Sequence, residues 1–278
     1  MKGDRKKLTP KNRLLLYVDI LGFREKVKDA DAAASVYQTI DTCLRASAKA
    51  IENAEGFGTI YFSDTILFYS RDGGFSHERF KKLCDVATDV FNQLLANHVP
   101  ISGAITFGPF YIRKKRDSDG QPIEGADPRL YFGQPLIEAY DAAKLEKWLG
   151  IIVCPSVTER FNPDYIDTMG RAFWQKRRDG KHFSLLLNPY FYLERYYQTM
   201  VRAGEKRKRE LLHPASELES LRFLMTKVRQ YSKDGDFSTA PAFRYHATMA
   251  FVRWTLSAAA FKWATGRDPL SAVAQGAY

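Results

Sequence analysis

Residues 14–23 have the sequence LLLYVDILGF, and the rest of the chain is organised around this stretch. Its apolar run has the length and composition of a buried β-strand. A single carboxylate, Asp19, interrupts the run shortly before a Gly22-Phe23 pair. Burying an unpaired carboxylate costs several kcal/mol, so we expect a cation to bind beside it.

A second stretch, residues 59–69 (TIYFSDTILFY), repeats the pattern with Asp64 at its middle. We expect two short strands here, at about 58–63 and 65–70, with Ser63 and Asp64 at the bend between them. Two carboxylates on neighbouring strands provide hard oxygen ligands of the kind that Mg²⁺ and Mn²⁺ prefer. The sequence therefore predicts a divalent-cation site that contains Asp19 and Asp64.

The composition indicates one substantial hydrophobic core with room for an additional helical region. The chain has 278 residues, of which 45% are hydrophobic and 14% aromatic. Its three cysteines are far apart and form no CxxC motif, which disfavours a disulfide framework or a zinc site and fits a reducing compartment. No stretch approaches 18 uninterrupted apolar residues, so we expect no membrane span and a soluble, cytoplasmic protein.

The formal net charge of +10 favours polyanionic partners, either nucleic acid or nucleoside triphosphates. No RNP, helix-turn-helix or zinc-finger pattern accompanies the basic residues, so we expect no nucleic-acid partner. Nucleic-acid binding by a polymerase-palm-like fold remains an alternative, and a strong salt dependence of DNA or RNA binding would support it. The basic residues cluster at 5–13, 113–116, 176–181 and 202–209.

The hydrophobic periodicity predicts an α+β fold with a mixed, ferredoxin-like sheet, because strands alternate with helices except at one tight hairpin. We expect a polar exposed loop or hairpin tip over 113–128. Gly103 lies inside a predicted strand, which indicates close approach of a ligand or of another backbone. The other expected elements are strand 14–20, helix 24–30, a helix from an Asp31 cap to about 53, helix 75–98, strand 101–108, helix 135–148 and strand 151–154.

The chain divides into three predicted parts. Residues 1–13 form a flexible basic lead-in, 14–188 the α+β domain, and 189–278 a helical C-terminal extension. Within the last two parts we expect a basic loop at 175–181 and a strand at 183–187, and then helices at about 189–203, 215–232 and 241–264. The extension would reinforce a dimer or bury the outer face of the sheet.

Three motifs in this order resemble the catalytic domain of class III nucleotidyl cyclases, over about residues 14–153. They are Val18–Phe23, Phe62–Ile66, and Phe132-Gly133 followed by the helix segment 142–146. The resemblance implies a ferredoxin-like cyclase fold and the conversion of a nucleoside triphosphate into a 3′,5′-cyclic nucleotide and pyrophosphate. It also implies two Mn²⁺ or Mg²⁺ ions per active site, held by Asp19, Asp64 and the backbone carbonyl of Ile20.

The same resemblance implies roles for further residues. The backbone N–H groups of Leu21, Gly22 and Phe23 would hold the β- and γ-phosphates. Tyr140 and Lys144 take the places of an Asn and an Arg that stabilise the transition state in the family, and a spacing of four residues puts them on one helix face. Family active sites lie between two chains, so the resemblance also implies a homodimer with composite sites.

The departures from the family concern the recognition of the base. Ile60 and Leu130 stand where purine cyclases have polar purine-reading residues, and neither can hydrogen-bond a purine. The bulky Tyr61, Phe62 and Tyr131 would shorten the base pocket. These features resemble the bacterial pyrimidine cyclases of the Pycsar anti-phage system. They imply UTP, or less readily CTP, as substrate, and a cyclic product that acts as an antiviral second messenger on a separate effector.

Structural roles for the same residues remain open. Asp64 could be an ordinary turn residue, Lys144 a solvated helix lysine, and Tyr61 an aromatic residue at the rim of the core. The alternative function is a catalytically inactive cyclase-like nucleotide sensor or dimerisation module. Tyr140 in place of the family's Asn favours that alternative, whereas the retention of both acids disfavours it.

Overall fold

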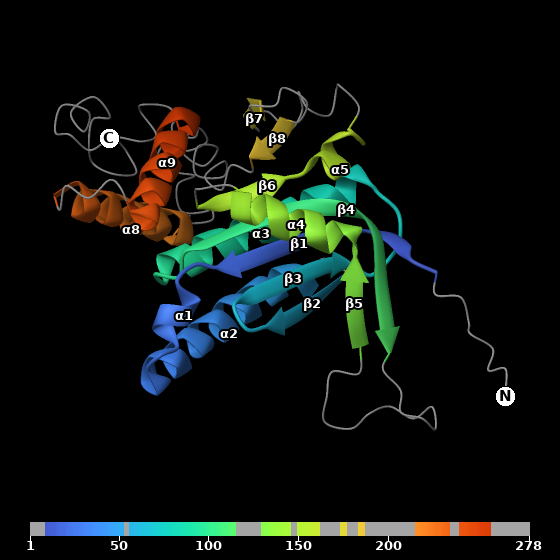
Figure 1. Ribbon diagram of the computed structural model, residues 1–278, viewed down its shortest axis with the longest axis horizontal. Coiled ribbons are helices and arrows are strands. Elements are labelled where there is room, and N and C mark those ends of the chain that lie inside the picture. Colours follow the sequence, from blue (N-terminus) through green and yellow to red (C-terminus); the bar gives the residue numbers. More distant parts are fainter. Residues whose placement is uncertain are drawn as a thin grey trace, which may run out of the picture.

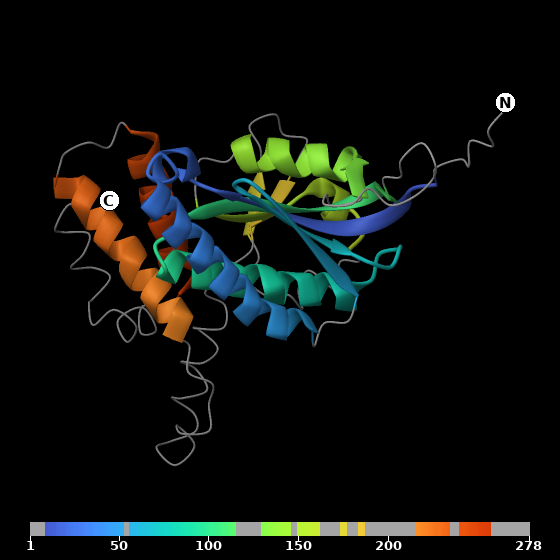
Figure 2. The same cartoon turned by 90° about the horizontal axis from the view of Figure 1, so that it is seen from below.

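The computed structural model describes residues 9–52, 56–114, 129–145, 149–161, 173–176, 183–186, 215–233 and 239–256. These residues form an eight-stranded sheet with helices on both faces and two further helices at one end (Figures 1 and 2). The elements are β1 (Lys11–Ile20), α1 (Phe23–Lys26), α2 (Ala30–Glu52), β2 (Phe57–Phe62), β3 (Thr65–Ser70), α3 (His77–Ala96), β4 (Ile101–Lys114), β5 (Arg129–Gly133), α4 (Gln134–Leu145), β6 (Gly150–Val153), α5 (Pro155–Thr158), β7 (Phe173–Lys176), β8 (Phe183–Leu186), α8 (Ala215–Lys233) and α9 (Ala240–Thr255).

The sheet is mixed, as the sequence predicted. Its strands follow the order β2-β3-β1-β4-β6-β8-β7, and β5 pairs with β4 outside this path. β4 and β6 are parallel, whereas the other pairs are antiparallel. β1 is therefore central, between the hairpin strand β3 and the long strand β4, which confirms the predicted ferredoxin-like α+β class.

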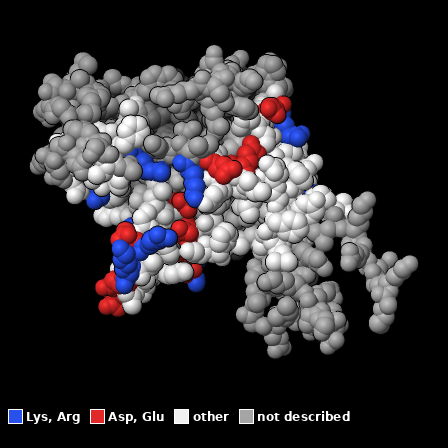
Figure 3. Space-filling view, viewed as in Figure 1, with Lys and Arg blue, Asp and Glu red and all other residues white. Residues whose placement is uncertain are grey.

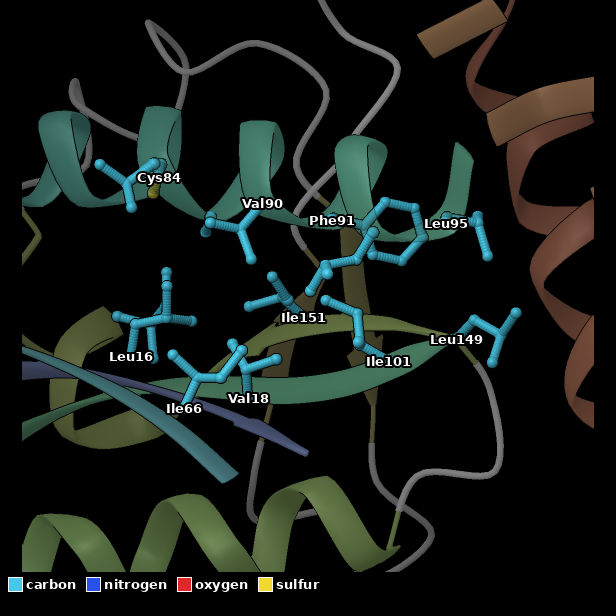
Figure 4. Close-up of a cluster of buried hydrophobic side chains, with 14 of the residues drawn as sticks. Leu16, Val18, Ile66, Cys84, Val90, Phe91, Leu95, Ile101, Leu149 and Ile151 are labelled. Atoms are coloured by element: carbon cyan, nitrogen blue, oxygen red, sulfur yellow. The ribbon is translucent and has the colours of Figure 1, made fainter. Parts of the chain in front are cut away.

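The two faces of the sheet carry different helices. Figure 2 shows α4 on one side of the sheet and α2 and α3 on the other. Leu16 and Val18 of β1 are completely buried in the α3-side cluster, where they face Val90 and Phe91 of α3 (Figure 4). Side chains alternate along a strand, so Leu15 and Tyr17 point to the α4 side. There they share a cluster with Ala139, Ala142 and Ala143 of α4.

The helices α8 and α9 belong to the core on the α3 side. Leu221 and Leu224 of α8 are fully buried in the same cluster as Phe91, and Val252 of α9 joins them. Ser220 Oγ of α8 donates a buried hydrogen bond of 2.8 Å to Asn92 Oδ1 of α3. These helices therefore pack on α3 and on one end of the sheet rather than covering its outer face (Figure 1).

Close backbone packing explains the glycine within β4. A Cβ on Gly103 would lie 2.4 Å from the backbone oxygen of Tyr17 in β1. The prediction of close approach at Gly103 is thus confirmed, and the approaching group is another backbone.

Several local predictions were wrong. α1 has four residues instead of the predicted helix 24–30. Asp29 rather than Asp31 caps α2, because Asp29 Oδ1 accepts hydrogen bonds from the amides of Asp31 and Ala32 at 2.8 and 2.9 Å. β7 includes Gln175 and Lys176, which were predicted as part of a basic loop.

Other predictions fall on segments outside the described residues. These are residues 1–8 of the predicted lead-in 1–13, residues 115–128 of the predicted loop 113–128, helix 189–203, the boundary at 188/189 and the end of the last helix beyond residue 256. Residues 11–13 of the predicted lead-in belong to β1, and residues 113–114 of the predicted loop belong to β4. Among the helices that the structure describes, none combines the length and the apolar character that crossing a membrane requires.

Candidate metal and nucleotide site

Asp19 lies near the end of β1, on the same face as α4. It follows Leu15 and Tyr17 in the alternation of the strand, and it pairs with Thr65 of β3 and Ser102 of β4. Unlike the fully buried residues before it, Asp19 is half-buried. The apolar face under α4 therefore ends in a carboxylate that solvent can reach.

Asp64 occupies the turn between β2 and β3, as predicted. The preceding residue, Ser63, has a left-handed backbone with φ 55°, which makes the bend tight. The backbone oxygen of Asp64 accepts a hydrogen bond of 2.8 Å from the amide of Ile20. This bond joins the backbone next to Asp19 directly to the backbone of Asp64, so the strand pairing itself brings the two acids together.

The electrostatics of Asp19 are those of an acid that lacks a full counter-charge. Burial and then the neighbouring Asp64 carboxylate raise the pKa of Asp19 above its ordinary value. Tyr17, Lys144 and Arg244 act in the opposite direction and lower the pKa, but they do not cancel the increase. A divalent cation between the two acids would relieve both the burial of charge and the like-charge repulsion.

Tyr17 connects the two acids with α4. Its hydroxyl donates to Asp19 Oδ1 at 3.4 Å and lies 3.5 Å from Thr65 Oγ1. Burial, with the nearby Asp19 and Asp64, raises the pKa of Tyr17 to about 12, so the phenol stays protonated at neutral pH. Its ring meets the ring of Tyr140 edge-on, with 6.1 Å between the centroids.

Tyr140 and Lys144 lie on one face of α4, as their spacing predicted. Lys144 Nζ donates a hydrogen bond to the Tyr140 hydroxyl and lies 4.0 Å from the centroid of its ring. This hydrogen bond is the main reason that the pKa of Lys144 is raised, and Asp19 contributes to the same increase. Both predicted transition-state residues therefore lie near Asp19 of their own chain.

The turn after β1 offers fewer phosphate donors than predicted. The amide of Leu21 donates to the backbone oxygen of Pro100 at 2.9 Å and so is already used. Gly22 has φ 72°, a left-handed conformation that suits glycine, and Phe23 is buried at the start of α1. Within the described part of the chain, the amides of Gly22 and Phe23 have no hydrogen-bond partner.

The predicted base-binding residues do not come together within one chain. Ile60 is on the α4 face and is buried in the cluster under α4. Tyr61 points to the opposite face, where burial and then Asp41 of α2 raise its pKa. Leu130 pairs with Arg113 of β4, eleven residues from Ser102, the partner of Asp19. At about 3.3 Å per residue, Leu130 is roughly 35 Å from Asp19 along the sheet.

The donor set fits a hard divalent cation. In the described residues no group of three or more His, Cys, Asp or Glu side chains could hold a metal ion, so the candidate site rests on two carboxylates. Mg²⁺ and Mn²⁺ are commonly bound by one or two carboxylates, with water and substrate phosphate oxygens completing the shell. Asp19 and Asp64, with the carbonyl of Ile20 proposed beside them, meet that requirement.

Two neighbours of the site, Tyr17 and Arg244, were not predicted, and a third, Phe62, was predicted only as a residue that shortens the base pocket. Tyr17 contacts Asp19, and Arg244 of α9 interacts electrostatically with Asp19. Phe62 lies opposite Thr65 on β2, which puts it on the same face as Asp19, and it is 52% exposed. The strand alternation would have identified Tyr17, whereas no sequence signal connects Arg244 with Asp19.

Charged side chains are mixed over the face shown in Figure 3. Lysines and arginines lie beside aspartates and glutamates, and the described residues form no continuous basic field on this face. This arrangement gives no support to an extended nucleic-acid track on that face.

Comparison with known proteins gives distant structural likenesses. No family model and no curated protein match the sequence. The chain is similar to the guanylyl cyclase domain of the RhoGC fusion protein from the aquatic fungus Blastocladiella emersonii, with 11% identity and a TM-score of 0.46 over 64% of this chain and 96% of that one. It is similar to the adenylyl cyclase CyaB from P. aeruginosa, with 11% identity and a TM-score of 0.47 over 66% and 96%. The guanylyl cyclase Cya2 is a third, with 11% identity and a TM-score of 0.43 over 64% and 92%. Likeness at this level assigns no activity to the chain.

Proposed function

We propose that the protein is a divalent-metal-dependent nucleotidyl cyclase, which converts UTP, and less readily CTP, into the 3′,5′-cyclic nucleotide and pyrophosphate. The observation that carries the proposal is the pair of acids at one end of the central strand β1. The hydrogen bond from Ile20 N to Asp64 O joins their backbones, and Lys144 lies beside them. The three cyclase-like motifs of the sequence support it. We further propose that the product is a second messenger of antiviral defence, which acts on a separate effector.

In the proposed reaction the ribose 3′-oxygen attacks the α-phosphorus. The bond from that phosphorus to the bridging oxygen breaks, pyrophosphate leaves with the electron pair, and the hydroxyl proton passes to solvent. Bound divalent ions would favour ionisation of the hydroxyl and offset the charge of the leaving group. Asp19 and Asp64 would hold these ions, the amides of Gly22 and Phe23 would bind phosphate oxygens, and Lys144 would offset the charge that develops at phosphorus.

The choice of a pyrimidine rests on the residues near the site that could meet a base. Ile60 is apolar and buried, so it cannot accept or donate a hydrogen bond to a purine edge. Phe62 is exposed on the face of Asp19, next to the turn that carries Asp64, and could stack on a base. Tyr61 and Leu130 would take part only by meeting the site of a second chain, as in a composite dimer.

A catalytically inactive nucleotide sensor is the second candidate function. It is favoured by one observation, the hydrogen bond that holds the Lys144 ammonium on the Tyr140 hydroxyl. A sensor would bind a nucleoside triphosphate with a divalent ion and release no pyrophosphate.

The proposal is tested by incubating the full chain with each of the four ribonucleoside triphosphates and Mn²⁺. Cyclic products are separated by chromatography and pyrophosphate is measured in parallel. We expect cyclic UMP, with less cyclic CMP, and a loss of about 10³-fold in Asp64→Asn. Asp41→Asn, which changes an exposed acid of α2, is the matched control and should be fully active. A purine product would refute the base choice, and binding without any turnover would favour the sensor.

The composite dimer is tested by mixing two inactive variants. Asp64→Asn and Lys144→Gln chains are unfolded together, refolded and assayed. If Lys144 serves the acids of the partner chain, mixed dimers regain one complete site and activity returns. If Lys144 serves Asp19 of its own chain, as their interaction within one chain favours, no activity returns.

A further inference from the structure

α9 is held at the end of the sheet where the two acids lie. Thr248 Oγ1 accepts a hydrogen bond from the amide of Leu149 at 2.8 Å and lies 3.2 Å from the oxygen of the same residue. Leu149 directly precedes β6, whose first residue, Gly150, pairs with Ser102 of β4. Ser102 in turn pairs with Asp19. With about 4.8 Å between neighbouring strands, the anchor of α9 is about 10 Å from Asp19 across the sheet.

The same face of α9 presents Arg244 to the α4 side of the sheet. Arg244 precedes Thr248 by one helical turn, and Thr248 Oγ1 donates back to its backbone oxygen at 2.8 Å. Ala247, between them, packs against the cluster under α4, whereas Tyr245 and Met249 belong to the α3-side core. α9 therefore spans the boundary between the two cores, with Arg244 on the side of Asp19.

Arg244 and Asp19 interact electrostatically at this end of the sheet. Burial lowers the pKa of Arg244, and the carboxylate of Asp19 acts against that decrease. Arg244 lowers the pKa of Asp19 in return. A guanidinium remains charged at any ordinary pH, so this half-buried arginine is a fixed positive charge beside the two acids.

We propose that Arg244 binds the polyphosphate of the nucleotide, an inference that rests on the proposed function of the same site. The planar guanidinium can donate two parallel hydrogen bonds to phosphate oxygens, which an ammonium cannot. Lys144 is held by Tyr140 on α4, so Arg244 supplies a second cation from a separate element. The C-terminal helices thereby contribute a substrate-binding residue as well as core packing.

A purely structural ion pair between Arg244 and Asp19 is the competing explanation, and it makes different predictions. An ion pair that only fixes α9 would change thermal stability and leave phosphate affinity unchanged. A phosphate-binding arginine would change affinity for an isolated polyphosphate that has neither base nor ribose.

The test is titration of the full chain with inorganic tripolyphosphate in the presence of Mg²⁺, with binding measured by isothermal titration calorimetry. Arg244→Gln should weaken binding by about 10- to 100-fold, the usual range for losing a charged hydrogen bond, and Arg244→Lys should recover part of the loss. Arg222→Gln, which removes an exposed arginine of α8, is the matched control and should bind as the unmodified chain does. Thermal unfolding of each variant shows that it is folded.

Binding of tripolyphosphate by Arg244→Gln within twofold of the unmodified chain would overturn the inference, as would the absence of any binding by the unmodified chain. If Arg244→Gln fails to fold, Arg244→Lys takes its place in the same titration. Weaker binding of tripolyphosphate then supports the inference, and binding within twofold of the unmodified chain overturns it. In the turnover assay we expect Arg244→Gln to raise KM more than it lowers kcat. If the unmodified chain releases no pyrophosphate from any nucleotide, the cyclase proposal fails, and the calorimetry still decides the role of Arg244.

Discussion

The two faces of β1 differ in what they do, although they alternate residue by residue along one strand. Leu14, Leu16, Val18 and Ile20 point to α3 and are at most 2% exposed. On the other face, Leu15 and Tyr17 are buried under α4, and Asp19 then emerges half-buried. The α3 face is apolar to its end, whereas the α4 face changes from core to charged site within three side chains.

The difference follows from what covers each face. α3 and the C-terminal helices enclose the α3 side, where the buried cluster extends to Ile101 and Leu149 (Figure 4). On the other side, α4 ends at Leu145, and its last turn carries the exposed Lys144. One face therefore contributes stability, while the other holds acids whose charge Lys144 and Arg244 offset only in part. The following variants test this division of roles, beginning with the largest expected effect.

Leu16→Ala tests the α3 face. Leu16 is completely buried, so removing its side chain should lower the free energy of unfolding by about 2–5 kcal/mol. Chemical denaturation measures the loss. The affinity of the folded protein for Mn²⁺ should stay within twofold, and a larger change would show that the two faces are not independent.

A comparison within β2 sharpens the distinction. Tyr61 and Phe62 are 50% and 52% exposed, but they lie on opposite faces. If Phe62 stacks on the base, Phe62→Ala should weaken nucleotide binding by about 1–3 kcal/mol, whereas Tyr61→Ala within one chain should not. Fluorescence titration with a labelled nucleoside triphosphate measures both. An equal loss in the two variants would show that a second chain brings Tyr61 to the site.

Asp19→Asn should stabilise the metal-free protein at neutral pH while abolishing its function. A carboxyl group whose pKa is raised by folding contributes stability that is fully present below its unfolded pKa and is lost as pH rises through its folded pKa. The asparagine variant has no such loss, so in EDTA at pH 8 its melting temperature should exceed that of the unmodified chain. Each kcal/mol corresponds to about 2–4 °C for a domain of 150–250 residues.

Thermal scans from pH 3 to pH 8 check this sign. The advantage of Asp19→Asn should shrink as the pH falls, because both proteins are then uncharged at this position. Asp41→Asn is the control, with little change expected at any pH. A metal-free Asp19→Asn protein that melts below the unmodified chain at pH 8 would contradict the predicted direction.

Tyr17→Phe should have the smallest effect, about 0.5–1.5 kcal/mol on stability. The Tyr17 hydroxyl lowers the pKa of Asp19 through its 3.4 Å hydrogen bond, so its removal should raise that pKa further. The pH below which Mn²⁺ binding is lost should then rise. Tyr69→Phe, which changes another buried tyrosine on the same face, should leave that pH unchanged.

The sequence was sufficient to predict the centre of the fold and the elements that carry Asp19 and Asp64. An apolar run with one carboxylate identifies β1, and a repeat of that pattern identifies the hairpin with Asp64 at its bend. The pairing of β1 with β3 then brings the two acids together. The mixed sheet follows from a hairpin within otherwise alternating strands and helices.

Other parts of the site depend on tertiary packing and could not be predicted. A shift of one residue in a strand moves a side chain to the other face, and this separates Tyr61 from the neighbouring Phe62. The hydrogen bond of Leu21 to Pro100 depends on where α3 returns the chain to the sheet. Arg244 influences the pKa of Asp19 because α9 is hydrogen-bonded to Leu149, and no local pattern encodes that placement.

Direct Mn²⁺ binding tests the central claim, that Asp19 and Asp64 form one divalent-cation site. Electron paramagnetic resonance counts free Mn²⁺ during titration of the full chain, of Asp19→Asn, of Asp64→Asn and of the double variant. We expect the unmodified chain to bind Mn²⁺ and each single variant to lose most of that affinity, with little further loss in the double variant, because two ligands of one site are not additive. Equal Mn²⁺ binding by all four proteins would contradict the account.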